Sequence, residues 1–94
     1  MTPGAQFMHL FVDPKKGVTR EQIEEELNLA IDWYRYYAKC YVLYTTSDQN
    51  QWYNRLESLV RPDGSLFIAP LDVTRRHGWM SKDFWEWIDK AKDK

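Results

Sequence analysis

The sequence has little of several features that would indicate a particular chemistry. Its single cysteine, Cys40, cannot form a disulfide within the chain and stands in an apolar run, so we expect a small buried side chain in a reducing compartment. The four glycines stand singly, which excludes a glycine-rich phosphate-binding loop. No stretch approaches the roughly 18 apolar residues of a membrane span, and no signal-peptide pattern opens the sequence. We therefore expect a cytoplasmic protein with no membrane contact.

An excess of charge of one sign is also missing. Thirteen basic residues stand against 14 acidic ones, a formal net charge of -1, so the total charge does not favour nucleic acid or an anionic surface. His9 and His77 have no second histidine or cysteine at metal-ligand spacing, which argues against a zinc site. Cys40 has no basic neighbour in a pattern typical of an activated nucleophile.

What is present is a globular composition with many aromatic residues. The 94 residues are 44% apolar and 29% charged, which predicts a single domain over 1–94, with an ordered core over 7–88 and a frayed tail over 89–94. Five Trp, six Tyr and four Phe are more than a small core holds, so we expect some of them on a surface patch or an interface.

Periodicity and capping signals predict alternating strands and helices. We expect a central strand over 7–12, and then a helix, because Thr19 and Gln22 form a capping box before an apolar stripe of helical spacing. Asp48 and Gln51 form a second such box before the second helix.

The aromatic segment 32–46 decides the fold class. It is too rich in aromatic and β-branched residues for a helix and too long for one strand, so we divide it into strands over 33–36 and 39–46. A last strand over 65–72 contains Pro70, which indicates a sheet edge or a bulge, and Ser81 caps a final helix. The order is β-α-β-β-α-β with an extra C-terminal helix, which predicts an α+β ferredoxin-like sandwich. Without the hairpin, the order becomes a small β-α-β-α-β-α unit.

Three segments resemble the SinR-like family of small bacterial proteins and, more distantly, the CRISPR-associated nucleases that acquire spacers. They are FMHLFVD, DWYRYYAKCYVLYTT and SLFIAPLD, within residues 7–79. The resemblance implies a ferredoxin-like fold, a homodimer and a largely unassigned function. In the nuclease relatives an aspartate that ends the first strand is associated with a divalent metal shared across the dimer, and Asp13 has the matching place. Pro14 follows it directly, with no companion acidic residue in the strand, which departs from that pattern.

The candidate sites each have a structural alternative. Asp13 is a candidate catalytic residue and Mg²⁺ ligand for phosphodiester hydrolysis, or a plain turn residue. The candidate nucleic-acid contacts, which are otherwise solvated loop residues, are Lys15, Lys16, Arg75 and Arg76.

Three further aromatics, Trp85, Trp87 and Tyr41, are candidate interface residues. Phe84, Trp85 and Trp87 cannot all face inward from one helix, so we expect Trp85 or Trp87 at an interface or a rim. Tyr41 lies in a strand with two apolar faces, which predicts an interior position or cover by a partner.

Our leading hypothesis is a binding or interaction protein without catalysis. It would be a homodimer that works through its aromatic surface and sheet edges. The sequence does not decide whether its further partner is a protein or a nucleic acid. The alternative is a divalent-metal-dependent nuclease or nucleic-acid-binding protein with Asp13 at a dimer-shared site. No cofactor is expected, except Mg²⁺ under the nuclease alternative.

Overall fold

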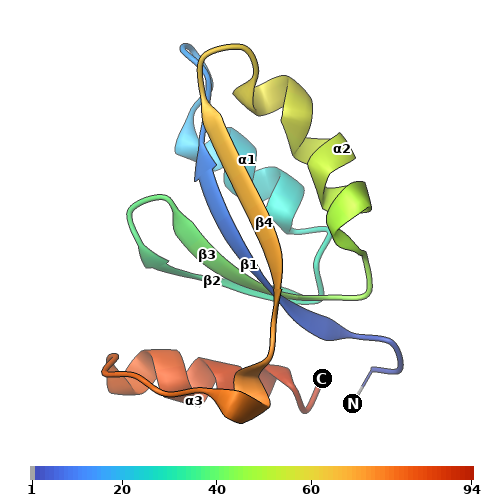
Figure 1. Cartoon of the computed structure of the whole chain (residues 1–94), viewed down its shortest axis with the longest axis vertical. Helices are drawn as coiled ribbons and strands as arrows, with labels where there is room; N and C mark the ends of the chain where they lie inside the picture. The colour runs from blue at the N-terminus through green and yellow to red at the C-terminus, as the bar shows by residue number, and fades with distance from the viewer. Residues whose placement is uncertain (1) are drawn as a thin grey trace.

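A computed structural model describes residues 2–94 as an α+β domain with one antiparallel sheet (Figure 1). Its elements are β1 (Gln6–Asp13), α1 (Arg20–Leu27), β2 (Asp32–Tyr37), β3 (Cys40–Thr45), α2 (Gln49–Val60), β4 (Ser65–Leu71), a 3₁₀ turn (Val73–Arg75) and α3 (Lys82–Ala91). The predicted hairpin is confirmed, because β2 and β3 pair antiparallel, and the β-α-β-α-β-α alternative is therefore wrong.

The sheet has the strand order β2-β3-β1-β4. The first strand is central, as predicted. β4 is an edge strand, which agrees with the prediction from Pro70 that this strand lies at a sheet edge or contains a bulge. Phe7 pairs with Leu71 at one end of β1, and Asp13 pairs with Ser65 at the other. These two pairs mark the two opposite ends of the sheet.

The helices begin where the capping signals predict. The Thr19 hydroxyl accepts a hydrogen bond from the Gln22 backbone nitrogen at 3.2 Å, and the Gln22 side chain accepts one from Thr19 N at 2.8 Å. Asp48 and Gln51 form the same reciprocal pair for α2, and Ser81 caps α3. Each cap satisfies donors that the first turn of a helix leaves unpaired.

Two apolar cores lie on opposite faces of the sheet. Alternation along the strands sends one set of side chains to α1 and α2 and the other set to α3. The first core contains Met8, Leu10, Val12, Ile23, Leu27, Tyr41, Leu43, Trp52, Leu56 and Val60. The second contains Phe7, Val42, Tyr44, Phe84, Ile88 and Ala91. Figure 1 shows α3 lying apart from the α1 and α2 pair, at the end of the sheet where the chain begins.

The C-terminal helix extends into the segment 89–94, whose fraying stays a prediction. The helix continues through Ala91, which is 0% exposed, because Ala91 extends the inward stripe of Phe84 and Ile88. Beyond it, Lys94 binds Asp32 through its ammonium at 2.7 Å, and its carbonyl accepts a hydrogen bond from Thr2. The expectation of fraying from residue 89 came from its position at the end of the chain.

None of the helices in residues 2–94 has the length and apolar character that crossing a membrane requires.

Candidate binding sites

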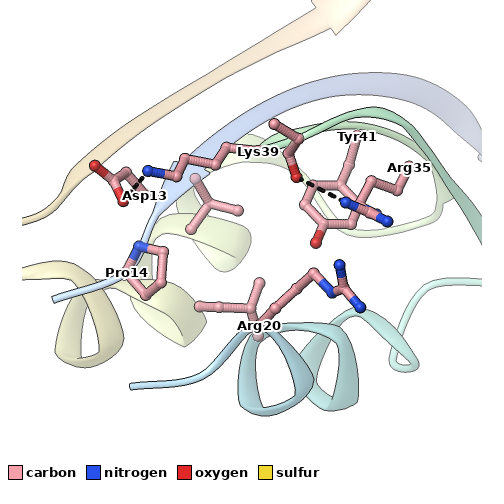
Figure 2. A pocket seen from close by; sticks show the side chains of 9 residues that line it. Asp13, Pro14, Arg20, Arg35, Lys39 and Tyr41 are labelled. Carbon is pink, nitrogen blue, oxygen red and sulfur yellow. Dashed lines mark hydrogen bonds and ion pairs between the residues drawn. The ribbon is translucent and has the colours of Figure 1, made fainter. Parts of the chain in front are cut away.

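Asp13 lies at the mouth of a cavity of about 410 Å³ between the end of β1, α1 and the β2–β3 hairpin (Figure 2). The cavity combines an apolar wall with a charged rim. Its lining residues are Val12, Asp13, Pro14, Arg20, Ile23, Arg35, Ala38, Lys39 and Tyr41.

The Asp13 carboxylate is paired with a cation from the hairpin. Its Oδ1 lies 2.8 Å from Nζ of Lys39, and both side chains are partly exposed. Within residues 2–94, no three His, Cys, Asp or Glu side chains are grouped so that they could hold a metal ion. A divalent cation at Asp13 would compete with the Lys39 ammonium and would need ligands from outside these residues. The metal and catalytic roles of Asp13 stay predictions.

Glu24 organises the other wall of the cavity. Its Oε2 lies 3.6 Å from Nε of Arg20 and 3.9 Å from Nε of Arg35, and it accepts a hydrogen bond from the Tyr41 hydroxyl at 2.9 Å. Burial raises the pKa of Tyr41, and the hydrogen bond to Glu24 raises it further. The phenol therefore stays a donor throughout the physiological range.

Tyr41 is a core residue of this chain. It is 1% exposed and packs beneath α1, with its ring edge-on to Trp33 at 5.7 Å between centroids. Tyr41 thus has the interior position that the strand pattern offered as one possibility, and its role at an interface stays a prediction.

A second cleft, of about 390 Å³, lies between α3, the sheet and the loop that follows β4. His9 and Tyr36 form its inner wall, with 2.7 Å between His9 Nε2 and the Tyr36 hydroxyl. Burial lowers the pKa of His9 and raises that of Tyr36, to which the neighbouring Cys40 thiol adds. Cys40 is only half-buried, which is more exposed than the sequence suggested.

The basic loop forms the outer wall of this cleft. Arg75, Arg76 and His77 all line it, and the nucleic-acid contacts of Arg75 and Arg76 stay predictions. The Arg76 guanidinium lies 3.0 Å from Asp89 Oδ1 and 5.2 Å from the Trp85 ring centroid. Arg76 also lowers the pKa of the Asp89 carboxyl.

The other predicted cationic pair lies elsewhere. Lys15 and Lys16 follow Asp13, whereas Arg75 and Arg76 follow Leu71, which pairs with Phe7 at the opposite end of β1. Six strand residues separate the two ends by roughly 20 Å. The four residues therefore do not form one basic patch.

The most exposed large aromatic was missed by the sequence analysis. Trp79, in the loop before α3, is 98% exposed. Trp85 and Trp87 are half-buried instead, and Trp87 packs against Phe7 at 6.1 Å and Tyr34 at 5.6 Å between ring centroids. The signal in the sequence was the position of Trp79 directly after Gly78 in a loop, outside any apolar stripe.

The free edge of the sheet is a third candidate surface. The β4 sequence SLFIAPL contains no charged residue, whereas the opposite edge strand, β2, contains Asp32 and Arg35. Phe67 is 61% exposed on β4, and the exposed Tyr53 of α2 lies across a shallow groove of about 320 Å³ that both residues line. An aromatic pair thus flanks an uncharged strand edge.

No family model, curated protein or solved structure matches this chain.

Proposed function

We propose that this protein is a non-enzymatic interaction module that forms a homodimer through the β4 edge. The observation that carries the proposal is an uncharged seven-residue edge strand beside exposed aromatic side chains. Folded proteins commonly protect such an edge with charged side chains or bulges, because its unpaired backbone groups pair readily with another strand. Here Pro70 is the only protective residue within β4, and it lies near one end.

A second copy of β4 satisfies this edge with the simplest symmetry. Two antiparallel β4 strands related by a two-fold axis form an isologous contact and extend the sheet from one protomer into the next. Phe67 and Tyr53 would then lie in the contact, where aromatic anchors contribute most of the binding energy. The proposal assigns the dimer to these residues in place of Trp85 and Trp87.

The proposal also includes the ferredoxin-like class and the kinship to SinR-like proteins. This class is supported by the strand order β2-β3-β1-β4, by the two helices on one face, and by the β2–β3 hairpin in the middle of the chain. α3 is an addition on the other face.

Sedimentation velocity of the purified chain tests the dimer. Phe67→Lys places a charge at the centre of the contact, so we expect the wild type to sediment as a dimer and this variant as a monomer. Tyr37→Lys is the matched control, because Tyr37 is a 73% exposed aromatic on the opposite edge strand. A dimer in the Phe67→Lys variant, or a monomer in the Tyr37→Lys variant, contradicts the β4 contact.

One observation favours a second function, the binding of single-stranded nucleic acid at the basic loop. Trp79 offers a fully exposed ring for base stacking, and Arg75 and Arg76 of the same loop line the adjoining cleft. Fluorescence anisotropy of a labelled mixed-sequence strand measures this binding. We expect affinity that falls with salt and falls about tenfold in the Trp79→Ala variant. Equal affinity of Trp79→Ala and wild type would remove the loop from consideration.

A further inference from the structure

The cavity beside Asp13 has the chemistry of a small-ligand site. Val12, Ile23 and Tyr41 form its floor and are almost completely buried, so the apolar surface that a ligand can reach comes from Pro14 and Ala38 and from the stems of Arg20, Arg35 and Lys39 on the rim. A volume of about 410 Å³ falls in the range of small-molecule pockets in proteins. An apolar wall with a few convergent polar groups is the usual composition of such pockets.

The charges around the cavity do not balance. Lys39 and Asp13 form a one-to-one pair at 2.8 Å. Glu24, in contrast, is shared by the guanidinium groups of Arg20 and Arg35, and its Oε2 also accepts a hydrogen bond from the Tyr41 hydroxyl. One positive charge of this group therefore has no counterpart at the cavity wall.

The two guanidinium groups are placed to receive an anion. Figure 2 shows Arg20 and Arg35 on the same side of the cavity, close to the Tyr41 hydroxyl. Arg35 is oriented by a hydrogen bond of 3.3 Å from its Nη1 to the Ala38 carbonyl. Their contacts with Glu24 run through Nε at 3.6 and 3.9 Å, which leaves terminal nitrogens for a further acceptor. Guanidinium groups bind carboxylate and phosphate oxygens through such paired donors.

We propose that this cavity binds a small organic anion, with one carboxylate or phosphate group held by Arg20 and Arg35 and a compact apolar body against Pro14 and Ala38. The site needs neither a metal ion at Asp13 nor the β4 edge, so it is independent of the proposed dimer. Glu24 is the internal competitor of the ligand, because it occupies the same two guanidinium groups.

Titrations monitored by amide chemical shifts test the site with three probes of similar shape. Benzoate and phenyl phosphate each carry an acidic group on a phenyl ring, and benzamide is the neutral counterpart. We expect saturable shifts at the cavity residues with one or both anions and none with benzamide. The stronger of the two anions identifies the acidic group that the site prefers. Equal binding of benzamide, or no saturable shift with either anion, overturns the proposal.

Two charge variants give opposite expected results. Arg35→Gln removes one donor group and should weaken binding of the preferred anion about tenfold or more. Glu24→Gln removes the internal competitor, keeps an acceptor for the Tyr41 hydroxyl, and should strengthen binding several-fold. Arg61→Gln is the control, since Arg61 pairs with Glu57 at the end of α2 and does not line the cavity. If Arg35→Gln behaves as Arg61→Gln does, or if Glu24→Gln weakens binding, the assignment is wrong.

Discussion

Replacing Thr45 by valine removes one oxygen from the core and leaves two nitrogen donors without an acceptor. The Thr45 side chain is 1% exposed, at the end of β3. Its hydroxyl accepts hydrogen bonds from the Ser47 backbone nitrogen at 3.0 Å and from Nε1 of Trp52 at 3.2 Å. This pair of bonds joins β3 to the first turn of α2, and the Arg55 guanidinium covers the Trp52 ring at 4.6 Å from its centroid.

The size of the effect follows from the two orphaned donors. A buried donor without a partner costs about 1 to 3 kcal/mol, and the methyl group that valine adds returns about 1 kcal/mol. We therefore expect Thr45→Val to lower the free energy of unfolding by about 3 kcal/mol. For a domain of this length that corresponds to a fall of about 12 to 24 °C in Tm. Thr45→Ser keeps the acceptor and loses one methyl group, so about 1 kcal/mol is expected.

Urea unfolding followed by tryptophan fluorescence and circular dichroism measures both variants. A double-mutant cycle with Trp52→Phe isolates the indole bond, because phenylalanine has no N–H to orphan. If Thr45→Val loses no more stability than Thr45→Ser, the hydroxyl is not the acceptor that joins β3 to α2. The reasoning also fails if the two mutations in the cycle are additive.

Two further changes test the turn after α2 and the buried histidine. Gly64→Ala should unfold or severely destabilise the protein, because its Cβ would clash with the carbonyl oxygens of Asp13 and Val60. Thermal unfolding measures the loss of stability, and a wild-type Tm in this variant would contradict the prediction. Burial lowers the pKa of His9, so the unfolded chain binds a proton more readily than the folded one, and stability that is complete above about pH 6.5 is lost as the pH falls. In unfolding curves recorded across the pH range, His9→Gln should reduce the loss of stability at acid pH. His77→Gln, at an exposed loop position, should retain that loss. The same change of stability with pH in both variants would refute the role of His9.

Local signals in the sequence were sufficient for much of the fold. Capping boxes depend on residues three apart, so Thr19 with Gln22 and Asp48 with Gln51 predicted two helix starts that the structure confirms. The division of 32–46 into two strands also held, although the turn lacks a typical hairpin dipeptide. Pro70 correctly indicated an edge.

Tertiary neighbours were beyond the sequence analysis. The shared use of Glu24 by Arg20 and Arg35 joins α1 to β2, and no local pattern predicts that contact. The burial of Ala91 depends on how α3 packs on the second face of the sheet, a contact between segments far apart in the chain. The exposure of Trp79 had a local signal, its loop position after Gly78 outside any apolar stripe, to which the sequence analysis gave no weight.

The separation of the two apolar cores by the sheet gives the molecule two levels of unfolding. The apolar side of α3 packs into the second core, and α3 follows β4 through a 3₁₀ turn and a loop. We expect release of α3 to leave the first core in place, and therefore to require less free energy than global unfolding. Such an opening uncovers Phe7, Val42 and Tyr44, and with them an apolar sheet surface for a partner.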